Sequence, residues 1–150
     1  MCDKFFPDRY VASTYVIDFE GLYKEGVRGL IFDIDNTLVP HGAPADERAR
    51  ALFKRLKSIG FRCCLISNNQ KPRVEMFNKD IQVDYVYNAH KPSIRNYLKA
   101  MEIMGTDRDS TVFIGDQLFT DVWGAKRAGG PNILVKPIHP KEEIQIVLKR

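Results

Sequence analysis

Short apolar runs alternate along this chain with longer segments in which apolar residues recur every three or four positions. The short runs are bounded by turn residues and are typical of buried strands, whereas the longer segments have the period of helices that bury one face. The predicted strands are residues 29–35, 61–67, 83–89, 110–116 and 132–136, and the predicted helices are residues 46–60, 72–78, 92–104, 119–128 and 140–150.

The ends of several predicted helices carry recognisable signals. Asp46 stands just before the apolar period of its helix, where it can act as an N-cap, and Gly60 stands at the other end as a stop. Pro72 is suited to the first turn of the next helix, because its missing N–H would have no partner there. These signals support the helix boundaries independently of the apolar pattern.

Strict alternation of strands and helices predicts an α/β fold: a three-layer sandwich in which a mostly parallel, five-stranded sheet has helices on both faces. The length of 150 residues suits a single domain, with residues 1–27 as a leader that packs on or near the core. Ligands of such sheets bind at the carboxyl ends of the strands, near the point where the strand order reverses.

Composition excludes several classes of protein. The chain has 44% apolar and 28% charged residues and no apolar run long enough to span a membrane. Charges and a proline interrupt the first ten residues too early for a signal peptide, so we expect a cytoplasmic protein, with peripheral membrane contact left open. The net charge of +4 favours anionic partners, but no basic stripe is interleaved with aromatics, so nucleic acid is not an expected partner.

The three cysteines, Cys2, Cys63 and Cys64, do not form a metal, redox or disulfide pattern. None is followed six positions later by an arginine, which excludes the cysteine-based phosphatase loop. We interpret Cys63 and Cys64 as residues on the two faces of one buried strand.

Two carboxylates follow the first predicted strand. Asp33 and Asp35 alternate at its end and can approach one site. Because close carboxylates repel, a metal can hold one ionised while the other carries a proton, which would supply a nucleophile and a general acid. The alternative is an ordinary solvated turn, which the preceding apolar run Leu30–Phe32 disfavours.

Candidate ligands also follow the other strands. Ser67 and Asn68 can hydrogen-bond phosphoryl oxygens, although the same residues are common in turns. Lys91 stands before a predicted helix start, where a cation strengthens an anion site, although it can equally be a surface lysine. Asp116 and Asp121 are oxygen donors suited to Mg²⁺, and Asp121 can alternatively cap a helix.

With these residues in place, the chain resembles the haloacid dehalogenase (HAD) superfamily. The four motifs of that superfamily are matched here by FDIDNTL, the serine of LISNN, the lysine of HKPS and GDQLFTD. The likeness runs from residue 27 to residue 136. The resemblance implies a Rossmann-like sheet whose central strand carries the first motif. It also implies that Asp33 is a nucleophile that forms an aspartyl-phosphate and that Asp35 is the acid and then the base.

The resemblance also implies a metal and a phosphate site. Mg²⁺ would be held by Asp33, the backbone carbonyl of Asp35 and Asp116. Asp121 would orient a metal-bound water or Lys91. The phosphoryl group would be bound by Ser67 and Lys91, with the amide of Asn68 beside them.

The gaps between the motifs leave no room for a cap domain. In this respect the chain resembles subfamily IIIA of the superfamily. An open site suits a bulky phosphate ester. PDRYVASTYVID and GDQLFTDVWGAKRAG resemble small phosphatases of Gram-positive bacteria that are similar to mitochondrial phosphatidylglycerophosphate phosphatase. The resemblance implies a phospholipid substrate in phospholipid synthesis; the alternative is a soluble or macromolecular phosphate, such as a sugar phosphate, nucleotide or phosphoprotein.

The leader carries aromatic residues beside cations. Phe5, Phe6 and Tyr10, flanked by Lys4 and Arg9, can touch a membrane surface. The alternative is that these aromatics pack on the sheet of the domain itself. A binding domain without catalysis is a third possibility, which the complete set of motif residues disfavours.

Overall fold

The computed structural model of the chain describes residues 9–87, 94–116 and 131–138. A six-stranded sheet has the order β1-β6-β5-β2-β3-β4, and each pair of neighbours is parallel. The α/β prediction is confirmed, but the count of five strands was wrong, because the leader adds β1 at one edge. The strands are β1 (Arg9–Val11), β2 (Gly29–Asp33), β3 (Arg62–Ile66), β4 (Asp84–Val86), β5 (Thr111–Asp116) and β6 (Asn132–Val135).

The helices in the described ranges begin and end close to the predicted positions. Asp46 caps α2 by accepting a hydrogen bond from the Ala49 N–H, and Gly60 ends it with a φ of 121°. The helices are α1 (Phe19–Lys24), α2 (Glu47–Ile59), α3 (Lys71–Asn78) and α4 (Ile94–Met104), with 3-10 helices η2 (Thr14–Val16) and η3 (Arg108–Ser110). The predicted helices at residues 119–128 and 140–150 lie outside the described residues.

Helix α1 was not predicted from the sequence. It is only six residues long, and Asp18 caps it by accepting a hydrogen bond from the Gly21 N–H. Two turns or fewer show no clear helical period, so the apolar pattern could not reveal it.

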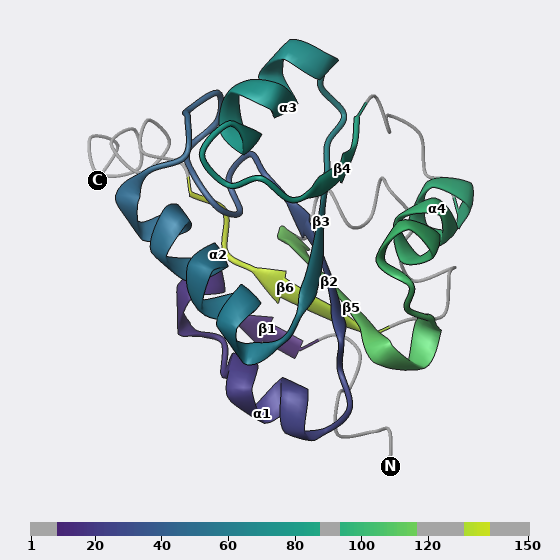
Figure 1. Ribbon diagram of the computed structural model, residues 1–150. Coiled ribbons are helices and arrows are strands. Elements are labelled where there is room, and N and C mark those ends of the chain that lie inside the picture. The colour runs from purple at the N-terminus through teal and green to yellow at the C-terminus, as the bar shows by residue number, and fades with distance from the viewer. Residues whose placement is uncertain (1–8, 88–93, 117–130, 139–150) are drawn as a thin grey trace.

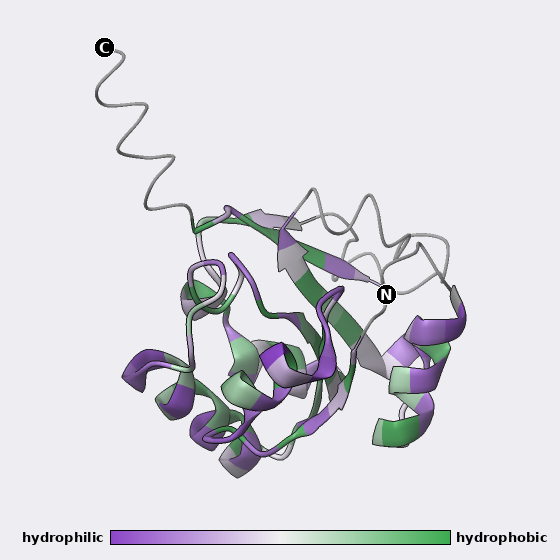
Figure 2. Cartoon of the chain, turned by 90° about the horizontal axis from the view of Figure 1, so that it is seen from above, coloured by the Kyte–Doolittle hydropathy of each residue, from purple (hydrophilic) through white to green (hydrophobic). Residues whose placement is uncertain are grey.

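Helices cover both faces of the sheet (Figure 1). Seen from above, α4 lies on one side of the sheet, with α2 and α3 on the other (Figure 2). Alternate strand residues separate into two apolar cores: Leu30 and Phe32 join the core under α1 and α2, whereas Ile31 joins the core under α4. This arrangement is the three-layer sandwich that the pattern predicted.

The adjacent cysteines follow the same alternation. Cys63 lies in the core under α2 and Cys64 in the core under α4, as predicted. Burial raises the pKa of each thiol to about 12. Because the thiolate is the reactive form, neither cysteine is suited to nucleophilic chemistry.

The strand order reverses beside β2. The chain runs from β2 to β3 and β4 in one direction, then crosses to β5 on the opposite side of β2. Ligands of open parallel sheets bind at such a reversal, outside the carboxyl ends of the strands. The carboxyl end of β2, where Asp33 lies, is therefore the expected place for a site.

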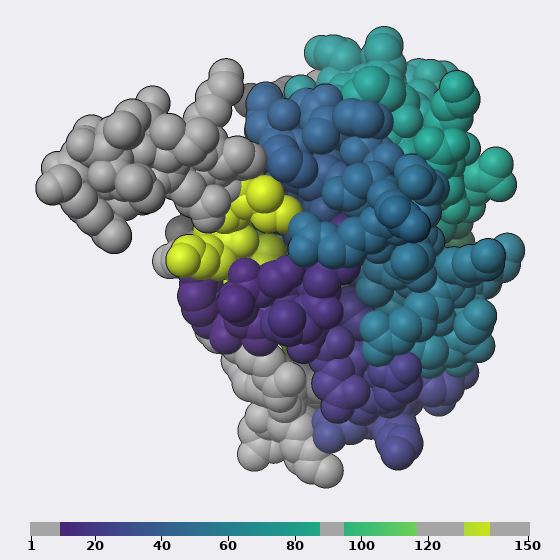
Figure 3. Space-filling model, turned by 90° about the vertical axis from the view of Figure 1, so that its left-hand side faces the viewer, coloured from purple at the N-terminus to yellow at the C-terminus, as the bar shows by residue number. Residues whose placement is uncertain are grey.

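The leader lies along the edge formed by β6. Arg9 and Val11 pair with Ile133 and Val135, so the first described residues extend the sheet. Figure 3 shows the leader in purple beside β6 in yellow. Tyr10 is 57% exposed on this edge. In the described ranges, no helix is long and apolar enough to cross a bilayer.

Phe32 is a test of the core under α2. Its ring is fully buried and packs against Phe19 and Phe53 at centroid distances of 6.3 and 5.1 Å. Phe32→Ala should lower the free energy of unfolding by about 3–5 kcal/mol, because transfer and cavity costs add. Urea denaturation would measure the loss, with the exposed Met76→Ala as the control within about 0.5 kcal/mol of wild type.

Candidate active site

Three neighbouring strands bring predicted site residues to one edge of the sheet. Asp33 ends β2, Ser67 follows β3 and Asp116 ends β5, and all three are buried, at 5%, 2% and 7% exposure. Because β2 lies between β3 and β5, Asp33 is the central residue of the three. The prediction that these strand ends share one site agrees with this placement. Lys91 and Asp121 lie outside the described residues.

Asp33 is a buried carboxyl next to other acids. Desolvation raises its pKa well above the ordinary value, and the charges of Asp116 and Asp35 raise it further. The Thr37 hydroxyl opposes this shift by donating a hydrogen bond to Asp33 Oδ2 at 3.1 Å. A bound cation would favour the ionised form of Asp33, which is the form that can attack phosphorus.

Gly115 lets the two acidic strand ends come close together. A Cβ at this position would lie 3.3 Å from the Asp33 Cβ and 2.8 Å from an atom of the Phe113 ring. Any side chain would therefore push β5 away from β2 or disturb the Phe113 ring. Gly115 therefore allows the close approach of β5 to β2.

The turn after β2 is closed by its own backbone. The Asn36 N–H donates to the Val39 carbonyl at 2.7 Å, and the Leu38 N–H donates to the Ile34 carbonyl at 3.0 Å. Asn36 adopts a φ of 65°, which asparagine tolerates better than most residues. The strand therefore ends at Asp33 rather than at residue 35 as predicted, because the chain turns directly after Asp33.

Two residues of the leader donate hydrogen bonds to this turn. The buried Thr14 hydroxyl donates to the Thr37 carbonyl at 2.9 Å, and the Tyr15 hydroxyl donates to the Leu38 carbonyl at 2.7 Å. Thr37 in turn holds Asp33 through its own hydroxyl. Thr14 and Tyr15 were not predicted from the sequence, because neither belongs to a motif and each acts on residues 23 positions away.

Asp35 turns toward a different set of partners. Its Oδ1 accepts hydrogen bonds from the Gly42 N–H at 2.8 Å and from Arg73 Nη2 at 2.7 Å, and its Oδ2 accepts one from Asn69 Nδ2 at 2.8 Å. The carboxylate is 13% exposed. Asp35 therefore lies at the rim, while its charge still acts on Asp33.

The predicted phosphate ligands differ in their surroundings. The Ser67 Oγ accepts a hydrogen bond from the Asn69 N–H at 3.0 Å, so the serine lies buried within a tight turn. Asn68 is exposed at the same turn. Asn69, the next residue of this turn, donates a hydrogen bond from its Nδ2 to Asp35 Oδ2.

The described carboxylates fit a divalent cation in their chemistry. Asp33 and Asp116 are oxygen donors on adjacent strand ends, and the mutual repulsion that raises the pKa of Asp33 is what a cation would offset. Within the described part of the chain, no three acidic, histidine or cysteine side chains form a metal cluster. Two carboxylates plus water and substrate oxygens suit Mg²⁺, which keeps several waters.

Residues 36–66 contain α2 and β3, and residues 68–87 contain α3 and β4. Neither of these fully described segments contains an inserted domain, so the predicted absence of a cap there is confirmed. Asp33 therefore lies in a site with no cap from these two segments.

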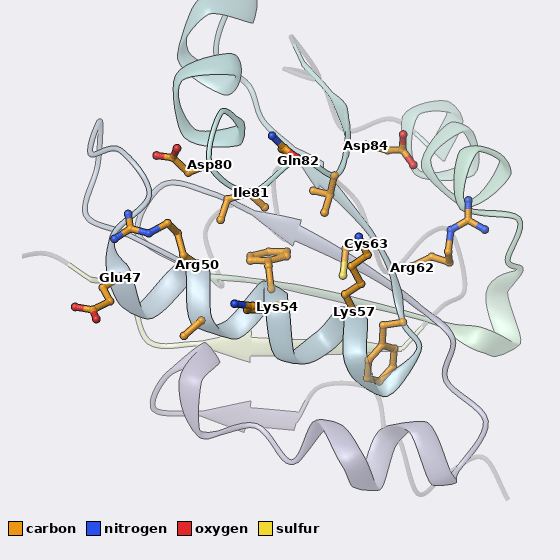
Figure 4. Close-up of a pocket in the computed structure, with 14 residues that line it drawn as sticks. Glu47, Arg50, Lys54, Lys57, Arg62, Cys63, Asp80, Ile81, Gln82 and Asp84 are labelled. Carbon is orange, nitrogen blue, oxygen red and sulfur yellow. The ribbon is translucent and has the colours of Figure 1, made fainter.

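A hollow lined by described residues lies elsewhere. It runs along α2 and is lined by Lys54, Lys57 and Phe61, by Cys63 of β3 and by residues 80–84 (Figure 4). None of its lining residues is a predicted site residue. The candidate chemistry is therefore defined by the strand ends and not by this hollow.

A parallel sheet of this order with buried carboxylates at its switch point is an arrangement suited to phosphoryl transfer. Residues 43–129 match the family of haloacid dehalogenase-like hydrolases. The chain belongs to this family, and the predicted superfamily and enzyme class, a phosphatase, are confirmed. The family match begins after the turn that carries Asp33 and Asp35.

Individual relatives agree with this assignment. The chain is 38% identical over 140 residues to the probable phosphatase YqeG of Bacillus subtilis, covering 92% of this chain and 81% of that protein. It is 25% identical over 157 residues to phosphatidylglycerophosphate phosphatase 1 of Arabidopsis thaliana, covering 94% of this chain and 43% of that protein.

A solved structure shows the same fold. The cobalt-bound form of deoxy-D-mannose-octulosonate 8-phosphate phosphatase (YrbI) from Haemophilus influenzae superposes with a TM-score of 0.57. The two chains share 14% identity, and the match covers 75% of this chain and 80% of the other. At this identity the likeness concerns the fold.

The raised pKa of Asp33 makes metal-free stability depend on pH. Because the folded pKa lies above the unfolded value, stability is lost as the pH rises from the ordinary aspartate range through the folded pKa. Asp33→Asn removes this loss, so its stability relative to wild type should increase with pH, by at most about 1.4 kcal/mol per pH unit.

Urea denaturation in EDTA between pH 5 and pH 8 would measure the difference between the two proteins. Asp84→Asn, which removes an exposed carboxylate on β4, is the control and should differ from wild type by a constant amount. A difference between Asp33→Asn and wild type that does not change with pH would contradict the interpretation.

Proposed function

We propose that this phosphatase is a Mg²⁺-dependent phosphomonoester hydrolase with Asp33 as its nucleophile, and that its substrate is phosphatidylglycerophosphate. The observation that carries the chemistry is the burial of Asp33 beside Asp116 at the switch point of the sheet. Burying the Asp33 carboxylate costs free energy, and no cation among the described residues offsets that cost. We infer that the carboxyl is kept at this position because the reaction uses it.

Two bond changes make up the first half of the proposed reaction. A carboxylate oxygen of Asp33 attacks phosphorus and forms an aspartyl-phosphate, while the bond between phosphorus and the leaving oxygen breaks. Asp35 donates a proton to that leaving oxygen, and the alcohol departs. The position of Asp35 at the rim, where its Oδ1 accepts hydrogen bonds from the Gly42 N–H and Arg73 Nη2, supports this role.

The second half releases phosphate. Water attacks the phosphorus of the aspartyl-phosphate, Asp35 takes a proton from that water, and the Asp33 carboxylate is regenerated as inorganic phosphate leaves. Asp33, Asp116 and the backbone carbonyl of Asp35 would hold Mg²⁺. When bound, the ion supplies positive charge against the phosphoryl oxygens. The Thr37 hydroxyl keeps the Asp33 side chain in place throughout.

We further propose that phosphate binding involves Ser67, Asn68 and Lys91, and that Asp121 supports the metal site. Ser67 is supported by its burial directly after β3, whose last residue, Ile66, pairs with Asp33. Exposure of Asn68 leaves its amide accessible to a ligand. Lys91 and Asp121 rest on the sequence motifs alone.

The lipid substrate is supported by the similarity to the plant phosphatidylglycerophosphate phosphatase and by the lack of a cap in residues 36–87. An uncapped site admits a phosphate on a large carrier. The exposed Tyr10 on the β1 edge suits the contact with a membrane surface that such a substrate requires. A peripheral location at the membrane is therefore part of the proposal.

Loss of the nucleophile tests the proposed chemistry. Asp33→Asn should reduce Mg²⁺-dependent phosphate release by about 10⁴-fold or more, because an amide cannot form the acyl-phosphate. Released phosphate would be measured with EDTA and with Mg²⁺ restored, and Asp84→Asn should behave like wild type. Full activity of Asp33→Asn would show that the proposed mechanism is wrong.

Substrate choice needs a separate comparison. Phosphatidylglycerophosphate in mixed micelles should be hydrolysed with a kcat/KM well above that of soluble sugar phosphates, nucleotides and a phosphopeptide. Activity on many soluble compounds with none on the lipid would reject the lipid assignment and favour the soluble-substrate alternative.

A further inference from the structure

Two of the three side-chain nitrogen atoms of Arg73 have no hydrogen-bond acceptor among the described residues. It is the third residue of α3, its side chain is 12% exposed, and its Nη2 contacts Asp35 at 2.7 Å. Its Nε and Nη1 are shielded from solvent, and within the described residues neither meets an acceptor. Shielded cationic donors without acceptors are costly, so a partner that the described residues do not supply is expected.

Asp35 does not need Arg73 in order to keep its position. The Gly42 N–H and the Asn69 side chain already donate to its two oxygens. An arginine placed only to orient Asp35 would duplicate these contacts while leaving two of its own nitrogen atoms unmatched. The arrangement is better explained if the guanidinium also serves a ligand.

The position of Arg73 indicates which part of a ligand it would meet. This inference rests on the proposed function, in which Asp35 contacts the leaving oxygen of the substrate. A guanidinium 2.7 Å from Asp35 is then within reach of substituents on the leaving alcohol. The exposed His41, whose Nδ1 lies 3.9 Å from Asp35, places a second potential cation on the same side.

We propose that Arg73 binds an anionic group on the leaving alcohol of the substrate. A small turn of the guanidinium would present its free N–H groups to a phosphodiester, which it can bind through two parallel hydrogen bonds. Arg73 would thereby select phosphomonoesters whose alcohol carries a second anion over those whose alcohol is neutral. The proposal adds a source of specificity to the phosphatase chemistry of Asp33.

A matched pair of soluble esters tests this selection. Glycerophosphoglycerol phosphate and glycerol 3-phosphate both release a primary alcohol, but only the first has a phosphodiester on the leaving group. Wild type should prefer the first in kcat/KM, and Arg73→Gln should reduce that preference by about 10- to 100-fold, the value of a charged hydrogen bond. The ratio does not depend on how much of the enzyme is folded.

Two further variants make the result specific. Arg73→Lys keeps the charge without the planar fork and should retain part of the preference. Lys71→Gln removes a cation from the same helix, where Lys71 faces Glu75 at 3.9 Å, and should change the preference by less than about twofold.

The outcomes separate this inference from the proposed function. An equal loss on both esters in Arg73→Gln, or no preference in wild type, would overturn the role of Arg73 and leave the phosphatase chemistry intact. If wild type hydrolysed neither ester, phosphatidylglycerophosphate in mixed micelles would decide the proposed function, which fails if the lipid is not hydrolysed either. Binding of glycerophosphoglycerol to Asp33→Asn, with and without Arg73→Gln, would then decide the inference: weaker binding without Arg73 supports it, and equal binding overturns it.

Discussion

The burial of Asp33 at the end of the central strand is the constraint on which this structure depends. A carboxyl that is 5% exposed and next to Asp116 resists ionisation, yet its ionised form is the nucleophile that the proposed chemistry requires. Low dielectric around the site also strengthens any cation or hydrogen-bond donor aimed at it. The same burial that is costly in the metal-free protein would therefore favour the proposed phosphoryl transfer.

Much of the surrounding structure serves to hold this carboxyl in place. Gly115 allows β5 to lie close to β2, and the Thr37 hydroxyl keeps the Asp33 side chain oriented. Thr14 and Tyr15 of the leader then fix the carbonyls of the turn behind it. The leader thus contributes an edge strand and also restrains the turn after β2, which connects the stability of the sheet edge with the geometry of the candidate site.

The two aspartates of the first motif have separate surroundings despite being two residues apart. Asp33 lies in the buried end of the sheet, whereas Asp35 lies at the rim among Gly42, Asn69 and Arg73. This separation suits a division of labour between attack on phosphorus and proton transfer at the leaving oxygen. Residues 36–87 include no cap domain that could recognise the leaving alcohol. In the proposal, Arg73 of α3 has that role instead.

The sequence by itself determined the α/β order, the caps of α2 at Asp46 and Gly60, and the strands that carry Asp33 and Asp116, because these features depend on local periodicity and neighbouring residues. Only the tertiary structure decided that the leader adds a sixth strand and that Asp35 meets Arg73, because these contacts join residues far apart in the chain. Arg73 and Asp35 are 38 positions apart, and no local pattern specifies such a pair.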